Sequence, residues 1–231
     1  MKKLFIVILF VSFIFLGVCG CKKEKNYGLE FKNEYESLNG VVNKNGKEHR
    51  TISIKENNPY IKTTPEEIVK KIEKKETFYL YVGDPLCPWC RSVLEKSIEV
   101  AEKNGVKEIY YIEIWDDDGS EILRDKYEIV NDKVTKTLEG TESYKKLLNY
   151  FDSVLKEYTI MDPNGNRVST GEKRIYAPNY FYVVDGKVKK MVSGTSDKQT
   201  DSRGELTKEI LEDEENIFNE FFLQACSIDG C

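Results

Sequence analysis

Residues 77–90 read Thr-Phe-Tyr-Leu-Tyr-Val-Gly-Asp-Pro-Leu-Cys-Pro-Trp-Cys and join a strand pattern to a pair of closely spaced cysteines. The aromatic and branched residues over 77–82 predict a β-strand. Gly83-Asp84-Pro85 ends that strand. Residues 91–104 then predict a helix with one apolar face, and Gly105 is a natural stop for it. Cys87 and Cys90 are therefore expected where a strand leads into a helix.

The surrounding sequence predicts an α/β fold. A second strand over 106–115 completes strand, helix and strand in under 40 residues, which requires the two strands to be parallel. Thr64-Pro65-Glu66-Glu67 predicts an earlier helix start. The stretches 180–184 and 187–192 predict a hairpin around the turn Asp185-Gly186. Four further elements are expected: a hairpin within 38–54, a helix over 142–156, a strand over 158–161 and a terminal helix over 205–225.

The spacing of Cys87 and Cys90 predicts redox chemistry. Two cysteines three residues apart on a first helical turn can close a small disulfide ring. The first lies at the helix N-terminus, where unpaired N–H groups favour a thiolate, so Cys87 is expected to be an exposed nucleophile with a depressed pKa. Cys90, one turn into the helix, is expected to be the shielded resolving thiol. Pro88 fits the first turn, and Trp89 offers a flat apolar surface beside the reactive sulfur.

These features together resemble the thioredoxin superfamily over about residues 77–225. The resemblance rests on three features in order. They are the strand–Cys87-Pro88-Trp89-Cys90–helix unit, Ala177-Pro178 just before a strand, and the Asp185-Gly186 hairpin followed by Gly194. The Pro-aromatic dipeptide is closer to that of glutaredoxins. The overall plan is also similar to extracellular thioredoxin-like lipoproteins of Gram-positive bacteria, including those labelled bacteriocin-transport accessory proteins.

The resemblance implies a thioredoxin-like fold, with a central mixed sheet flanked by helices. It implies a cis bond at Pro178, which would flank Cys87 and dock an incoming chain beside the backbone of Ala177. Two departures from the family pattern stand out. Thioredoxin keeps a buried acid six residues before its first cysteine, and Tyr81 stands there, so proton transfer at Cys90 would use water, Asp84 or Glu113. An insertion over about 116–175 precedes the cis-proline strand; it is expected either to shape partner choice or to add a structural layer.

The first twenty residues differ from the rest. Met1-Lys2-Lys3 precedes residues 4–18, of which only Ser12 and Gly17 are not apolar. A positive start before an apolar stretch too short for a comfortable transmembrane helix predicts a signal peptide over 1–20. Without it, 33 basic residues face 40 acidic ones, and the formal charge moves from −5 to −7. The remainder is thus neither a polytopic membrane protein nor, with its acidic balance, a nucleic-acid binder.

Cys19 and Cys21 compete as the end of this signal. The segment resembles a bacterial lipobox, in which a small residue precedes a cysteine that takes a diacylglycerol. Cys21 follows Gly20, whereas Cys19 follows the bulkier Val18, so Cys21 is the expected lipidation site. An ordinary secretory signal and an uncleaved anchor are the alternatives, and each also places the body outside the cytoplasm, where disulfides persist. Residues 21–37 are expected to be a flexible tether, and 38–231 the thioredoxin-like domain.

The remaining candidates carry weaker signals. Cys226 and Cys231 form a second pair, interpreted as a local structural disulfide; a second redox couple and a four-cysteine zinc site are the alternatives. His49, the single histidine, is expected to be a surface or hairpin residue. The acidic run 116–118 lacks the spaced ligands of a calcium loop and reads as a solvated turn. No metal and no organic cofactor is expected.

Two functions follow from the sequence. The first is a membrane-anchored thiol–disulfide oxidoreductase on the extracytoplasmic face of the bacterial cell membrane, in which Cys87 attacks, Cys90 resolves and Pro178 positions the partner. Its partners would be protein or peptide disulfides and dithiols. The second is a non-enzymatic accessory lipoprotein whose thioredoxin-like body docks a transporter or a secreted peptide, with Cys87–Cys90 as a structural disulfide. Reactivity of Cys87 separates the two.

Overall fold

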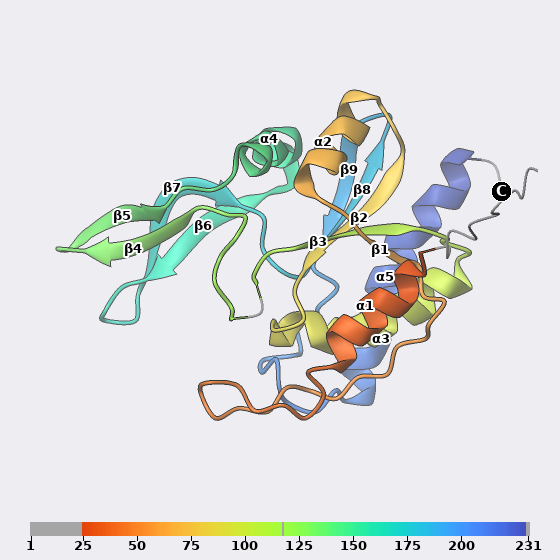
Figure 1. Cartoon of the computed structure of the whole chain (residues 1–231), viewed down its shortest axis with the longest axis horizontal. Coiled ribbons are helices and arrows are strands. Elements are labelled where there is room, and N and C mark those ends of the chain that lie inside the picture. Colours follow the sequence, from red (N-terminus) through yellow and green to blue (C-terminus); the bar gives the residue numbers. More distant parts are fainter. Residues whose placement is uncertain (1–24, 117, 230–231) are drawn as a thin grey trace, which may run out of the picture.

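A five-stranded mixed sheet forms the centre of the molecule (Figure 1). The computed structural model describes residues 25–116 and 118–229, with side chains described as far as Leu223. The strands of the sheet are β1 (Tyr60–Lys62), β2 (Phe78–Gly83), β3 (Ile109–Glu113), β8 (Asn179–Val184) and β9 (Lys187–Val192). Their order is β1-β3-β2-β8-β9. β1, β3 and β2 run parallel to one another, which confirms the expected strand, helix and strand unit; β8 runs antiparallel to both of its neighbours, β2 and β9.

Side chains along β2 alternate between two cores, one on each face of the sheet. Tyr79 and Tyr81 face the core that also holds side chains from helices α1 (Tyr27–Glu36), α3 (Pro88–Lys103) and α5 (Lys208–Asp229). Phe78, Leu80 and Val82 face the core formed with α2 (Pro65–Glu73) and α4 (Glu142–Phe151). A strand buried on both faces needs apolar residues at every position, which the run 77–82 supplies. The predicted fold class is therefore confirmed: a thioredoxin-like arrangement with helices on both faces and an insertion before β8.

The expected tether over 21–37 is wrong where the structure describes it, because residues 27–36 form helix α1. The side chain of Asn26 caps this helix by accepting a hydrogen bond from the Leu29 N–H at 3.0 Å. Phe31 and Tyr35 lie four residues apart on one face and are fully buried. The Phe31 ring stacks on Tyr60 with 4.3 Å between ring centroids. The many charged residues of the segment cover the outer face and hide this short apolar stripe.

The buried Arg91 fastens residues 35–50 to the start of α3. Its guanidinium donates to the carbonyl of Tyr35 at 2.8 Å, to that of Arg50 at 2.6 and 2.9 Å, and to Asn39 Oδ1 at 2.6 Å. The expected hairpin over 38–54 shrinks to one bridge between Val42 and Glu48. The carbonyl groups of Tyr35 and Arg50 thus accept hydrogen bonds from the Arg91 side chain instead of from a neighbouring strand.

The insertion before β8 forms two hairpins and a helix. The hairpins are β4 (Lys126–Val130) with β5 (Lys133–Leu138), and β6 (Lys156–Met161) with β7 (Arg167–Arg174); a short 3-10 helix, η1 (Asp152–Val154), follows α4. Helix α4 packs on the sheet, whereas both hairpins extend away from it (Figure 1). A buried ion cluster holds their base, because Glu121 accepts from Arg124 at 2.6 Å and from Arg174 at 3.0 Å. Within the described residues, no helix is long and apolar enough to cross a membrane.

A buried acid on α5 makes stability depend on pH. Glu214 has no exposed surface, and neither carboxylate oxygen has a hydrogen-bond partner among the described residues. Burial raises the pKa of Glu214 to about 8, against the attraction of Lys96 and Arg50. The folded chain therefore keeps a proton that the unfolded chain releases above its ordinary pKa of 4.5. The free energy of unfolding should consequently fall as the pH rises from that value toward 8.

Glu214→Gln should remove this pH dependence, because a neutral amide pays no cost of ionisation in the core. The variant should gain stability relative to the wild type by about 3 kcal/mol between pH 5 and pH 8. Urea unfolding at a series of pH values measures the difference. Glu212→Gln, at an exposed position of the same helix, is the control and should give a small difference that does not change with pH. If the difference in free energy of unfolding between Glu214→Gln and the wild type does not change with pH, the raised pKa of Glu214 is contradicted.

Candidate functional site

The two cysteines lie at the junction of β2 and α3, as expected. After β2 the Asp84 carboxylate accepts a hydrogen bond from the Leu86 N–H at 2.8 Å, and the Asp84 carbonyl accepts from the Cys87 N–H at 3.2 Å. This turn brings the chain into α3, whose N-cap is Cys87 and whose first residue is Pro88. The backbone N–H groups of Trp89 and Cys90, in the first turn of α3, have no partner within the helix and lie near the Cys87 sulfur.

Both cysteines are free thiols, and the local donors favour a thiolate on Cys87. A hydrogen bond from the Cys90 thiol, together with the N–H groups of Cys90 and Trp89, lowers the pKa of Cys87 despite its burial. Only 4% of Cys87 is exposed, so the expectation of an exposed nucleophile is wrong. The cis-proline segment covers it, since Cys87 Sγ lies 3.7 Å from the Ala177 carbonyl oxygen.

Cys90 has the opposite environment. It is fully buried, and burial together with the neighbouring Cys87 raises its pKa well above the ordinary value for a thiol. The hydroxyl of Tyr81 donates to the Cys90 sulfur and opposes part of that rise. The same hydroxyl lies 3.0 Å from the hydroxyl of Tyr35 on α1. Tyr81, at the position where thioredoxin keeps an acid, is therefore a hydrogen-bond partner of Cys90.

Asp84 is the buried acid nearest to this pair in the sequence. Its carboxylate accepts from the Leu86 N–H and, at 2.9 Å, from the Trp115 N–H beyond β3. Burial raises the pKa of Asp84 to about 7, although these two hydrogen bonds favour the ionised form. Glu113 is engaged elsewhere, because it binds Lys62 at 2.5 Å. Of the two acids considered from the sequence, Asp84 has the environment of a group that exchanges a proton near neutral pH.

The peptide bond between Ala177 and Pro178 is cis, as the resemblance implied. This peptide bond directly precedes β8. Strand β8 pairs with β2, and β2 ends at Gly83, three residues before Leu86. Gly194, after β9, has a φ of +79°, and a Cβ there would lie 2.3 Å from the Phe218 ring. Only glycine fits this close approach of the loop to α5. The sheet and α5 thus hold the cis-proline segment against Cys87.

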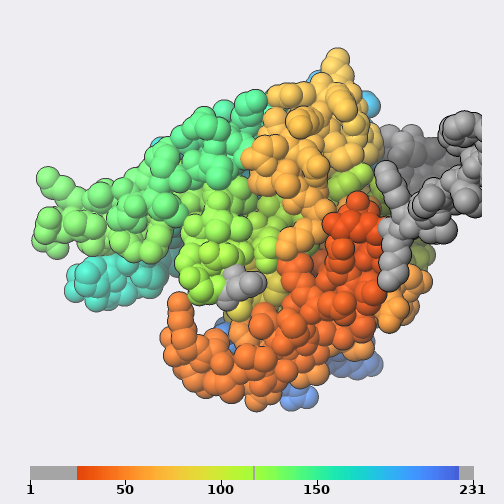
Figure 2. Space-filling model, viewed as in Figure 1, coloured from red at the N-terminus to blue at the C-terminus, as the bar shows by residue number. Residues whose placement is uncertain are grey.

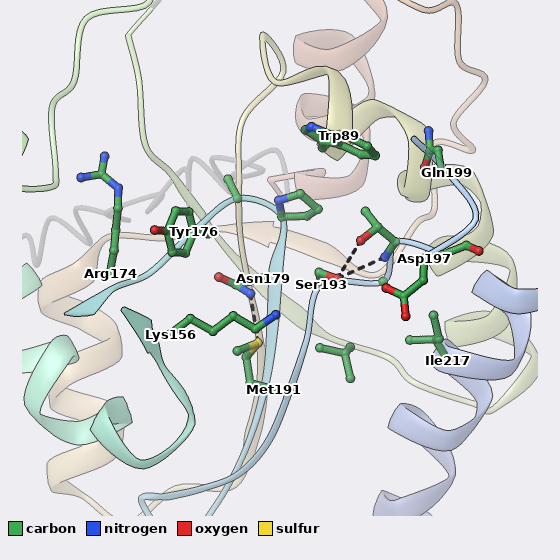
Figure 3. A pocket seen from close by; sticks show the side chains of 16 residues that line it. Trp89, Lys156, Arg174, Tyr176, Asn179, Met191, Ser193, Asp197, Gln199 and Ile217 are labelled. Atoms are coloured by element: carbon green, nitrogen blue, oxygen red, sulfur yellow. Dashed lines mark hydrogen bonds between the residues drawn. The ribbon is translucent and has the colours of Figure 1, made fainter. Parts of the chain in front are cut away.

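A hollow of about 570 Å³ lies beside the cis proline, and we call it the cis-proline hollow. Trp89, Ala177 and Pro178 line it, whereas Pro88 lies on another side of the helix start. Figure 3 shows Trp89 at one end, Tyr176 and Arg174 on one side and Asp197 on the other. Lys156 and Arg174 reach it from the insertion, and no local sequence pattern marked them. The insertion therefore contributes to the wall of the site as well as adding a layer.

The remaining sequence candidates do not join this site. His49 is buried, with 4% of its surface exposed, so the expected surface position is wrong, whereas the alternative of a hairpin residue fits its N–H, which donates to the Val41 carbonyl at 2.8 Å beside the Val42–Glu48 bridge. The lipidation candidate Cys21, with Cys19 and the signal peptide, lies outside the described residues, as does Cys231. The side chain of Cys226 is also outside them, so the expected Cys226–Cys231 disulfide stays a prediction. In the described ranges, no group of three or more His, Cys, Asp or Glu residues could hold a metal ion.

Comparisons with known proteins add only distant structural similarity. No family model matches the sequence, and no curated protein matches it. A similar solved structure is thioredoxin O2 from Arabidopsis thaliana in the oxidized state, at 11% sequence identity and a TM-score of 0.32. The alignment covers 60% of this chain and 85% of that one. The fold and site of this chain follow from its own sheet order and geometry.

Replacing Cys90 should reveal its role as a hydrogen-bond donor to Cys87. Cys90→Ala removes the donor that most lowers the pKa of Cys87, so that pKa should rise. Alkylation by iodoacetamide at pH 7 should then slow by roughly threefold or more, because the thiolate fraction falls. Cys90→Ser keeps a donor at the same place and is the matched control, with a rate close to that of the wild type. Equal rates for both variants would show that the donor has no effect.

Proposed function

We propose that this protein is a thiol–disulfide oxidoreductase that acts through Cys87 and Cys90. The observation that supports the proposal most is the asymmetry of the two thiols. The pKa of Cys87 is lowered by donors at the start of α3, and that of Cys90 is raised by complete burial. An attacking thiol that ionises readily beside a resolving thiol that stays protonated is the arrangement that dithiol–disulfide exchange requires.

The exchange proceeds through a mixed disulfide. The Cys87 thiolate attacks one sulfur of a partner disulfide, and the other partner sulfur leaves as a thiolate that takes up a proton. Cys90 then loses its proton and attacks Cys87 Sγ, which closes the Cys87–Cys90 disulfide and releases the second partner thiol. The partner gains two electrons and two protons, and this chain loses the same. The reverse sequence oxidises a partner dithiol.

The proton of Cys90 is the difficult part of this sequence, because the thiol is buried. Asp84 is fully buried, and its pKa near 7 lets it hold or release a proton at neutral pH. The Tyr81 hydroxyl donates to the Cys90 thiolate once it forms. We assign Asp84 to proton exchange and Tyr81 to stabilising the thiolate. The carbonyl of Ala177 and the cis-proline hollow would receive the backbone of the partner beside Cys87.

Reduction of insulin by the purified full-length chain tests the enzymatic proposal. In the presence of a small dithiol, the wild type should accelerate insulin reduction, and Cys87→Ser should lower the rate to the background because no attacking sulfur remains. Cys226→Ser keeps the pair at the start of α3 and is the control, with the wild-type rate. Full activity in Cys87→Ser would sink the proposal and favour the non-enzymatic accessory lipoprotein.

The same proposal includes a lipid anchor at Cys21 that holds the enzyme on the extracytoplasmic face of the membrane. Its support is the sequence of residues 1–21 alone. Cys21→Ser should abolish incorporation of an alkyne fatty acid and move the chain from the membrane fraction to the soluble fraction. Cys19→Ser should leave both measurements unchanged. Retained labelling in Cys21→Ser with loss in Cys19→Ser would transfer the anchor to Cys19.

A further inference from the structure

A second hollow, of about 500 Å³, lies at the start of α3. Leu86 and Pro88, the two neighbours of Cys87 in the sequence, line it together with Trp115. Its outer wall is the loop after α1, through Leu38, Val41 and Lys44, and we call it the extension hollow. Figure 2 shows this loop, in orange, curving outward below the segment that follows β3. The residues that line the two hollows, Leu86 and Pro88 in one and Trp89 and Ala177 in the other, thus lie close to Cys87 in the sequence or in contact with it.

The walls of the extension hollow are apolar and partly open. Leu38, Leu86, Pro88 and Trp115 are each half-buried, and Val41 is 43% exposed. An apolar surface of this kind beside a reactive sulfur suits an apolar side chain of a bound peptide.

Two nitrogen atoms among the lining residues lack partners. His49 Nδ1 and Arg203 Nε have no hydrogen-bond partner within the described residues. Burial and the cations Arg91 and Arg203 lower the pKa of His49, which keeps the imidazole neutral. Among the described residues of the lining, the fixed charges are Lys44 and Arg203 against Asp118, so two positive charges face one negative charge. A carboxylate would satisfy the unpaired donor on Arg203 and balance this charge.

We propose that the extension hollow binds an extended segment of a partner protein that carries an acidic side chain next to an apolar one. The apolar side chain packs on Val41, Leu86 and Trp115, and the carboxylate pairs with Lys44 and Arg203. The segment continues across Cys87 into the cis-proline hollow. The identification of this segment as part of a substrate rests on the proposed function. Its binding in the extension hollow does not require thiol–disulfide exchange.

Binding is measured with the full-length chain carrying Cys87→Ser and Cys90→Ser, so that no exchange intervenes. The probes are two extended peptides that differ only in having Glu-Leu or Lys-Leu before a serine. The sequence contains two tryptophans, so adding Trp89→Phe leaves Trp115 as the reporter in the extension hollow. The Glu-Leu peptide should change Trp115 fluorescence in a saturable way and bind about tenfold more tightly than the Lys-Leu peptide.

Charge-inverting substitutions then test whether the preference for the Glu-Leu peptide arises in the extension hollow. Lys44→Glu with Arg203→Glu should reverse the preference between the two peptides. Lys187→Glu makes the same kind of change at the opposite end of β8 and should leave the preference within about twofold. Equal affinity for the two peptides in the starting chain would overturn the proposal. So would a preference that survives the double inversion, or one that Lys187→Glu changes equally.

Exchange of the wild type with the small, uncharged hydroxyethyl disulfide separates this proposal from the proposed function. If the wild type exchanges with this disulfide but binds the Glu-Leu and Lys-Leu peptides equally, the proposed peptide site in the extension hollow is overturned and the proposed enzymatic function is supported. A Glu-Leu preference without exchange would support the docking surface and overturn the enzyme.

Discussion

The carboxylate of Asp84 ties the reactive turn to the sheet. One oxygen accepts from the N–H of Leu86 within the turn, and the other accepts from the N–H of Trp115 in the segment that leaves β3. These two bonds fix where α3 begins relative to two parallel strands, and so fix the position of Cys87. A lost or displaced carboxylate would leave two buried N–H groups without an acceptor. Burial also raises the pKa of this anchoring carboxyl to about 7, so the group that holds the turn is the one to which proton exchange is assigned in the proposed function.

Local patterns in the sequence predict the parts of the fold that local chemistry determines. The apolar run 77–82, the capped start at Thr64 and the turn Asp185-Gly186 each specify their own element, and each forms where expected. The site follows in part for the same reason, because Cys87 and Cys90 sit on one helical turn. The cis bond at Pro178 came from the family resemblance, since one X-Pro dipeptide in a single sequence does not reveal its isomer.

What the sequence missed depends on contacts between distant residues. Helix α1 is held by Phe31 and Tyr35 packing on β1, β2 and β3, and four of its ten residues are charged. Arg91 looks like an ordinary surface residue of a helix until the carbonyls of Tyr35 and Arg50 are placed around it. The burial of Cys87 depends on Ala177, ninety residues away in the chain. Helical and strand periodicities carry no information about such contacts.

The early start of α1 changes how far the folded body could move from the membrane if the chain is anchored through Cys21. Five residues separate Cys21 from Tyr27. Fully extended, they span about 17 Å. A free segment reaching to residue 37 would span roughly three times as much. Because α1 is packed into the core, a folded body joined to the anchor by this short linker would stay close to the lipid headgroups. Proteins emerging from the membrane, or moving along its surface, would then meet Cys87 far more often than proteins in the surrounding medium.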